Sequence, residues 1–417
     1  MKITKTLLYI TLFLLQAYLV RFNIGPYPSN LSEILIGLTA IAFFAETIKE
    51  KSFIQKLKNL KKHWIILSLA GLTILSIIII PVHDKTALLR NLKFLFFGII
   101  IGLIFLETFR KNEERKTALK FAGLGAIAFG IFSVIYNLLG YNVAPDLRLL
   151  GPLDAAVYLA YYLTPFFIFF TIQSIENRKS TGRFITTDFI CALLLLILIL
   201  ATRSMGALGG SFLVLLIYSF KKNHKHIASS RLARLILASI AILISLATFY
   251  TKILPTIQTD YSSLDERGEI WATSLDLLSH PKNLLLGVGF GQFEDTYIKT
   301  VDTVLGHRPL DYYVIQPHDI FLLFVFNYGI LGLAFIIFCI YKTISRLAKS
   351  RTSKTSPLSA SEISLFILLY FFIHGLIDTP FYKNDLMILL IIFLEMGLTS
   401  PLRPHALSPE TKSSKAA

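Results

Sequence analysis

The chain has 417 residues, of which 54% are hydrophobic and 16% charged, with a net charge of +15. This composition excludes an ordinary soluble protein, because so apolar a chain is typical of proteins dissolved in lipid. A basic chain could bind nucleic acid, but the Lys and Arg residues fall in alternate loops between apolar segments, which indicates a multi-span membrane protein instead. Cys191 and Cys339 lie inside apolar runs, so neither disulfides nor thiol chemistry are expected.

The apolar segments predict an all-α polytopic membrane protein with about 12 transmembrane helices, several of them near the ~20 residues that cross the hydrocarbon. We expect one transmembrane domain over residues 1–400 and a disordered cytoplasmic tail over 401–417. The predicted segments are 6–20, 31–48, 64–80, 92–109, 118–139, 155–175, 185–201, 204–220, 235–254, 318–341, 361–379 and 385–400.

One loop is far longer than a connection requires. The basic loops 49–62 and 221–234 mark the cytoplasmic side under the positive-inside rule, which places the loop 255–317 outside, between the ninth and tenth spans. Long ordered loops are usually functional. The sequence therefore predicts that the functional site lies in this external loop.

An amphipathic helix is predicted inside the external loop. Ser263 and Glu266 have the spacing of a capping box, and the helix should stop at Pro281. Arg267 falls in the first turn, where it forms either a surface ion pair or an anion site together with the first N–H groups of the helix. The expected apolar face consists of Ile270, Trp271, Leu275 and Leu278.

The second half of the loop contains a glycine-rich turn and a histidine. Gly287 and Gly289 predict a close approach of the backbone to another element, and their spacing is not a dinucleotide fingerprint. His318 lies where the loop meets the next apolar segment, beside Asp319, a carboxylate that could orient it. A structural and a general-base role for this histidine both stay open.

Further polar residues lie at or within the apolar segments. Arg203 stands in a very short turn, where its side chain either extends to the membrane surface or binds a ligand. Arg90 and Arg148 are further charged residues outside or within the membrane. His374 and Asp378 are four residues apart and should share a helical face, as a proton relay, a metal pair or a packed hydrogen-bonded pair. Metal-binding and P-loop motifs are absent from the sequence, so no metal or cofactor is expected.

Five motifs occur in a characteristic order: Arg148-Leu-Leu-Gly151, Thr202-Arg-Ser204, Arg267 with Trp271, Leu286-Gly-Val-Gly-Phe290, and Pro317-His-Asp-Ile-Phe-Leu-Leu323 followed by Gly329-Ile-Leu-Gly332. Each is weak alone, but in this order and topology they resemble the O-antigen ligase and polymerase superfamily of membrane glycosyltransferases. One departure is Asp319, where the family commonly has Asn.

The resemblance implies a GT-C-like membrane enzyme. Its expected activity is metal-independent transfer of a glycan from an undecaprenyl-diphosphate-linked donor to a hydroxyl on a glycolipid or glycan acceptor, at the external face of the bacterial cytoplasmic membrane. It implies catalytic roles for His318, Arg267 and Arg203. Diphosphate binding is expected of Arg203, Arg267, Arg148 and Arg90, and supporting roles of Asp319, Gly287, Gly289, Trp271, His374 and Asp378.

The chemistry is physically reasonable without a metal. A diphosphate leaving group gains negative charge as the bond to the anomeric carbon breaks, and guanidinium groups stabilise that charge more in the transition state than before it. A histidine whose pKa lies near neutrality suits the removal of a proton from the incoming hydroxyl.

Several alternatives remain open from the sequence. Ligase, polymerase and protein O-oligosaccharyltransferase would share the donor and differ in the acceptor. A transporter or flippase of lipid-linked oligosaccharide is a different class, which would use intramembrane charges such as Glu46, Asp188, His374 and Asp378 around a central cavity, together with repeated halves. No internal repeat is visible.

Overall fold

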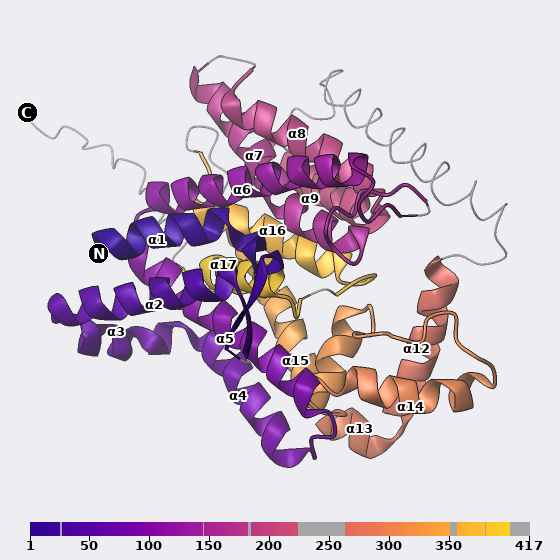
Figure 1. Cartoon of the computed structure of the whole chain (residues 1–417). Helices are drawn as coiled ribbons and strands as arrows, with labels where there is room; N and C mark the ends of the chain where they lie inside the picture. The colour runs from indigo at the N-terminus through magenta and orange to yellow at the C-terminus, as the bar shows by residue number, and fades with distance from the viewer. Residues whose placement is uncertain are drawn as a thin grey trace, which may run out of the picture.

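A computed structural model of the chain is mostly helical (Figure 1). The residues that it describes are 1–25, 27–144, 146–181, 185–223, 263–350, 357–379 and 381–400. The expected span 235–254 and the expected tail 401–417 lie outside these residues.

The helices follow the apolar segments of the sequence closely. Every predicted segment within the described residues overlaps a helix. The first part of the chain forms α1 (Lys2–Phe13), η1 (Leu15–Leu19), β1 (Arg21–Ile24), β2 (Tyr27–Asn30), α2 (Leu31–Lys49), α3 (Phe53–Asn59), η2 (Leu60–Lys62), α4 (Trp64–Ile79), α5 (Lys85–Thr108) and α6 (Asn112–Leu138). It continues with α7 (Ala156–Thr181), α8 (Thr187–Thr202), α9 (Met205–Asn223), α12 (Ser263–Ser279), α13 (Pro281–Leu286), α14 (Phe293–Leu305), α15 (Ile320–Lys349), α16 (Ala360–His374) and α17 (Asn384–Leu398).

Within the described ranges, 5 helices are long and apolar enough to cross a membrane, namely α2, α5, α6, α7 and α15. A sixth candidate is the pair formed by residues 53–62 and α4, which is bent by 80°. Shorter apolar helices are α8 and α16. The chain thus has the helices of a multi-pass membrane protein, whereas the count of about twelve spans stays a prediction.

The first apolar segment differs from its prediction. Instead of one helix over 6–20, α1 ends at Phe13 and a short 3-10 helix follows, leading into an antiparallel hairpin in which Arg21 pairs with Asn30. In the 3-10 segment, Gln16 donates from Nε2 to Asp385 of α17 over 2.6 Å. A contact between distant segments therefore overrides the local helical pattern.

Helices α16 and α17 form the centre of the fold (Figure 1). Every residue of α17 and nearly every residue of α16 is buried. Helix α5 packs closely on α17, because a Cβ at Gly98 would lie 2.9 Å from Met387 Cγ and one at Gly102 would lie 2.6 Å from Ile391 Cγ2. Small residues of this kind let membrane helices approach each other.

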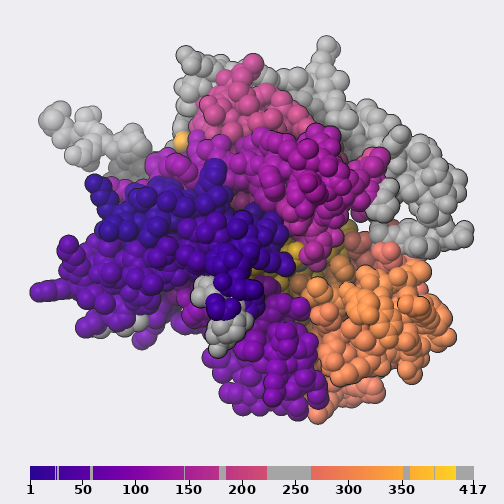
Figure 2. Space-filling view, viewed as in Figure 1, coloured from indigo at the N-terminus to yellow at the C-terminus, as the bar shows by residue number. Residues whose placement is uncertain are grey.

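The long loop contains more structure than the one helix expected from the sequence. Helices α12, α13 and α14 form a group beside α15 and lie in the salmon-to-orange area of Figure 2. Its core is formed by Ile270, Leu277 and Leu278 of α12 packed with residues of α14 and α15. Leu275, expected on the apolar face, is 61% exposed, because its side chain points away from the buried positions at i, i+7 and i+8.

The glycine-rich turn contacts a kink in α15. Gly287 has φ +87°, and a Cβ there would lie 2.7 Å from the carbonyl oxygen of Phe326. The same carbonyl accepts hydrogen bonds from Val288 N (2.8 Å) and Gly289 N (3.1 Å). It can do so because α15 departs from helical geometry at Gly329. The expected close approach is thus observed, and it fixes α12 to α14 against α15.

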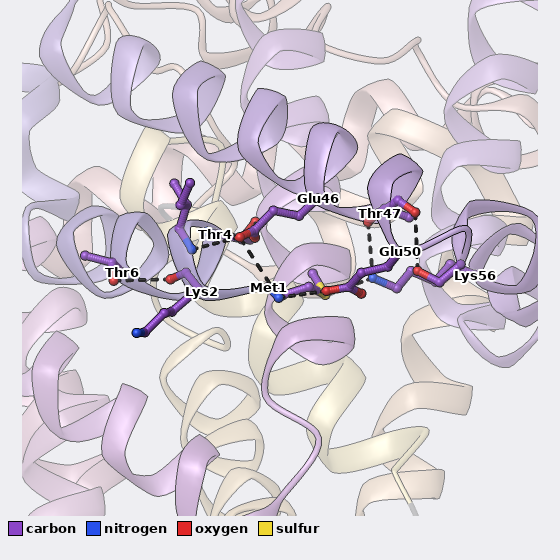
Figure 3. Close-up of polar contacts among 10 residues, drawn as sticks. Met1, Lys2, Thr4, Thr6, Glu46, Thr47, Glu50 and Lys56 are labelled. Carbon is purple, nitrogen blue, oxygen red and sulfur yellow. Dashed lines mark hydrogen bonds and ion pairs between the residues drawn. The ribbon is translucent and has the colours of Figure 1, made fainter.

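Two carboxylates considered for a transporter are paired within the fold. Glu46 of α2 caps the first turn of α1, accepting from Ile3 N (2.9 Å) and from the amide and hydroxyl of Thr4 (3.1 and 2.6 Å) (Figure 3). Asp188 pairs with Lys120 at 3.0 Å. Both carboxylates therefore join neighbouring helices.

Candidate active site

Three side chains from distant parts of the chain meet at one carboxylate. Asp378, which is 2% exposed, accepts a hydrogen bond at Oδ2 from Arg267 Nη2 over 2.9 Å. Its Oδ1 lies 2.8 Å from Nδ1 of His318. Arg267 also donates from Nε to the carbonyl oxygen of Ile377 at 3.0 Å. The carboxylate thus joins the arginine and the histidine, and we call these three residues the Asp378 cluster.

Each member of the Asp378 cluster comes from the end of a helix. Arg267 lies in the first turns of α12, His318 directly before α15, and Asp378 in the loop after α16. The backbone of His318 has φ +53°, a conformation that costs a non-glycine residue energy and is concentrated at functional sites. The surrounding helices therefore hold this histidine in a strained geometry.

The prediction that Asp319 orients His318 is not what the structure shows. Asp319 is the N-cap of α15, and its Oδ1 accepts from Leu322 N over 2.9 Å. An N-cap carboxylate is directed at the first N–H groups of its own helix, so it faces away from the preceding side chain. The carboxylate that contacts the imidazole is Asp378 instead.

Among the contacts of the described residues, the side chains of His374 and Asp378 are not hydrogen-bonded to each other but have separate partners. Helix α16 ends at His374, and the chain continues in turns in which Asp378 N donates to the carbonyl oxygen of His374 at 3.1 Å. The imidazole of His374 stacks on Tyr161 at a centroid distance of 3.9 Å and is bonded through Nδ1 to the hydroxyl of Tyr370 at 2.8 Å. Tyr161 in turn donates to the backbone carbonyl of Asp378 at 2.7 Å. Through its stacking on Tyr161, His374 thus packs against the group that holds the backbone of Asp378.

The charges within the cluster determine the protonation state of Asp378. Burial by itself would raise the pKa of this carboxyl, but the hydrogen bond from His318 and the positive charge of Arg267 outweigh burial and lower the pKa to about 2. An ionised carboxylate only accepts hydrogen bonds, so Nδ1 of His318 must be the donor. In a neutral imidazole Nε2 is then the nitrogen that can take up a proton.

A tryptophan connects α12 to the residue before the histidine. Trp271 donates from Nε1 to the carbonyl oxygen of Pro317 over 3.1 Å. Since Trp271 lies one turn after Arg267 on the same helix, this bond fixes the arginine and His318 relative to each other.

Arg203 and Arg148 lie together at a separate groove. Arg203 is the C-cap of α8 with φ +51° and donates from Nη1 to the carbonyl oxygen of Asp146 at 2.7 Å. Arg148 forms an ion pair with the Asp146 carboxylate. The groove has a volume of about 430 Å³, and its other walls are mostly apolar, among them Val134, Leu138, Val143 and Leu147.

Among the contacts of the described residues, Arg203 does not make the expected contact with Arg267 or His318, and the groove is linked to the Asp378 loop only through α9. Helix α9 starts two residues after Arg203, and a Cβ at Gly206 would lie 2.5 Å from Nε2 of His374. The start of α9 therefore touches the histidine that supports the Asp378 loop.

Arg90 takes part in a different contact. Its Nη2 pairs with Glu294 of α14 at 3.1 Å, with the two side chains 39% and 26% exposed. Within the described chain the arginine thus joins α5 to α14, and the donor-binding role expected for it stays a prediction.

The sequence did not point to Asp378 as the partner of Arg267 and His318, nor to Tyr161 and Tyr370. The predicted apolar run over 361–379 extends past the end of α16 at His374, although Gly375 and Pro380 are local signals for a helix end. Within the described ranges, no group of three His, Cys, Asp or Glu side chains could hold a metal ion.

Helical spans and a cluster of ionisable groups at helix ends define a multi-pass membrane protein with an enzyme-like site. Residues 190–337 of the chain match the family model described as O-Antigen ligase. Over this region the match confirms the resemblance to the O-antigen ligase and polymerase superfamily, a family that in general implies glycosyltransferase-type enzymes acting on lipid-linked glycans. The matched region contains Arg203, Arg267 and His318 and ends before Asp378. No curated protein matches the chain.

Proposed function

We propose that this protein transfers a glycan from an undecaprenyl-diphosphate-linked donor to a hydroxyl acceptor, without a metal, at the external face of the bacterial cytoplasmic membrane. The observation that supports this most is the Asp378 cluster, in which an ionised carboxylate holds Nδ1 of His318 at 2.8 Å. This arrangement leaves Nε2 as the proton acceptor, as a general base requires.

In the proposed reaction, Nε2 of His318 accepts the proton of the acceptor hydroxyl. The hydroxyl oxygen attacks the anomeric carbon, and the bond from that carbon to the diphosphate oxygen breaks. The diphosphate leaves with the bonding electron pair. Its growing negative charge is stabilised by guanidinium groups of the site, and a charge-assisted hydrogen bond of this kind contributes about 1.5–3 kcal/mol. The positive charge left on the imidazole is balanced by Asp378.

The groove beside Arg203 fits the lipid end of such a donor. Its apolar walls suit an isoprenoid chain, and Arg203 and Arg148 supply the cations that phosphate oxygens prefer. In this proposal the donor lies with its chain in the groove and its diphosphate directed toward the Asp378 cluster.

Ligase and polymerase activity share this mechanism and differ only in the acceptor, as would a protein O-oligosaccharyltransferase. The transporter alternative loses support, because Glu46 and Asp188 are paired with neighbouring elements instead of surrounding a cavity.

The test uses the purified full chain with a polyprenyl diphosphate oligosaccharide and hydroxyl acceptors, in the presence of a metal chelator. We expect transfer by the wild type and losses of about 10²- to 10⁴-fold for His318→Ala, the range for a lost general base. Arg267→Ala should lose a comparable part of the rate. His307→Ala and Arg308→Ala, which alter exposed side chains of the same region, serve as controls. Wild-type rates in both site variants, or loss of transfer on chelation, would refute the mechanism.

A further inference from the structure

A lysine that the mechanism does not use lies in an unusual environment near the Asp378 cluster. Nζ of Lys383 sits 3.4 Å from the ring centroid of Tyr158, and the lysine side chain is only 19% exposed. Among the described residues its ion-pair partner is Asp154, at 3.7 Å, which is 90% exposed. Because Asp154 is exposed to water and 3.7 Å away, it compensates little of the cost of burying the ammonium group.

Helix α7 places this lysine on the side of the Asp378 cluster. Tyr158 and Tyr161 are three residues apart on α7 and thus lie on the same face. Tyr161 holds the backbone of Asp378 by its hydroxyl at 2.7 Å, while Tyr158 holds the ammonium group of Lys383. One helical face therefore supports both ends of the loop that runs from Asp378 to Lys383.

With a neutral His318, the cluster carries no net positive charge, because it contains one guanidinium and one carboxylate. The charge of Arg267 is offset by Asp378 at 2.9 Å, and His318 must be neutral to accept a proton. A diphosphate carries at least two negative charges, so its binding calls for further cations. Lys383 is a fixed cation with a weakly held, solvent-exposed counter-ion. Burial lowers the pKa of Lys383 in spite of Asp385 and Asp154, which shows how incompletely its neighbours stabilise this charge.

We propose that Lys383 binds a phosphate oxygen of the donor diphosphate beside the Asp378 cluster, and that Asp154 is the counter-ion which the phosphate displaces. The inference rests on the proposed function and adds a donor-binding residue to it. Lys383 acts in binding, since a compact ammonium group is a point charge suited to phosphate. Tyr158 keeps that group in place.

Inorganic diphosphate is the probe, and its dissociation constant is measured by calorimetry on the purified full chain. We expect Lys383→Gln to weaken binding about tenfold, which corresponds to ~1.4 kcal/mol. Lys383→Arg keeps the charge and should stay within about threefold of wild type. Asp154→Asn removes the competing carboxylate and should tighten binding about threefold.

The matched control is the ion pair of Lys299 and Asp295 on α14, at 2.7 Å. Lys299→Gln and Asp295→Asn should leave the dissociation constant unchanged, and melting temperatures check that all variants are folded. The opposite signs expected for Lys383→Gln and Asp154→Asn are decisive. If the pair were only structural, both variants would change binding in the same direction or not at all.

The inference is overturned if Lys383→Gln binds diphosphate as the wild type does, if Asp154→Asn weakens binding, or if the wild type does not bind diphosphate. The proposed function is tested separately by transfer rates. If His318→Ala loses transfer while Lys383→Gln retains wild-type diphosphate affinity, the function stands and the role of Lys383 falls. If His318→Ala and Arg267→Ala transfer normally, the function falls, whatever the affinities.

Discussion

Replacing Asp378 by Asn tests the geometry of the site directly, because it keeps the shape of the side chain and removes its charge. In the wild type this carboxylate accepts from Arg267 at 2.9 Å and contacts Nδ1 of His318 at 2.8 Å. An amide can turn its NH₂ group toward Nδ1, which places the imidazole proton on Nε2 and blocks proton uptake there. The guanidinium also loses its counter-ion in a buried setting.

The expected losses follow from these two contacts. Transfer should fall by about 10²-fold or more, within the range for a displaced general base. Removing one member of a buried ion pair costs about 3–5 kcal/mol of stability, so the melting temperature should also fall. Initial transfer rates and thermal unfolding of the purified protein measure both. Asp311→Asn, which changes an exposed carboxylate, is the control. Transfer within about threefold of wild type in a folded Asp378→Asn protein would refute the proposed role of this carboxylate.

The difference in stability between the wild type and Asp378→Asn should depend on pH in a definite direction. The pKa of Asp378 is lowered to about 2 in the folded protein, below the ordinary value of 3.8. Its stabilising contribution is therefore complete above about pH 4 and is lost as the pH falls toward 2. The difference in melting temperature between wild type and Asp378→Asn should be constant from about pH 5 to 8 and shrink below about pH 4. A difference that vanishes already near pH 6 would contradict the ionised state.

Three further predictions concern the surroundings of the site. Gly206→Ala should lower the free energy of unfolding by about 1–3 kcal/mol and reduce transfer, because its Cβ would meet the ring of His374. Gly209→Ala should be tolerated, since a Cβ at Gly209 would have no atom within 4 Å. Equal melting temperatures for the two variants would contradict this packing. Trp271→Phe loses one hydrogen bond to the loop backbone, worth about 0.5–1.5 kcal/mol, and should slow transfer several-fold in the same assay; an unchanged rate would argue against its positioning role. A cysteine substituted for Thr300 should react with an impermeant thiol reagent in intact cells, since both native cysteines are buried; labelling only after permeabilisation would overturn the external placement.

The sequence predicts the helices better than it predicts the site. Long apolar runs locate α2, α5, α6 and α15, and the spacing of Ser263 and Glu266 locates α12. Helix α14 is not predicted, although Phe293, Tyr297 and Val301 recur every four residues, a pattern of one buried helical face. The periodicity of these three residues is a signal that the sequence does contain.

The partners within the site cannot be obtained in this way. His318 and Arg267 are recognisable by their motifs, but the choice between Asp319 and Asp378 as partner of the histidine depends on how α12, α15 and α16 pack. Asp319 is adjacent in sequence and caps its own helix, while Asp378, four residues beyond the end of α16, contacts the imidazole. Contacts between segments separated by 60 or more residues carry no local pattern.

The central claim is that His318 and Asp378 act as one catalytic unit, and a double-mutant cycle of transfer rates tests it most directly. His318→Ala, Asp378→Asn and the double variant are compared with wild type under saturating donor, each checked for folding. If the carboxylate acts through the imidazole, the double variant should be no slower than His318→Ala alone. If the two losses multiply instead, Asp378 acts independently of His318, and the claim of a single catalytic unit is contradicted.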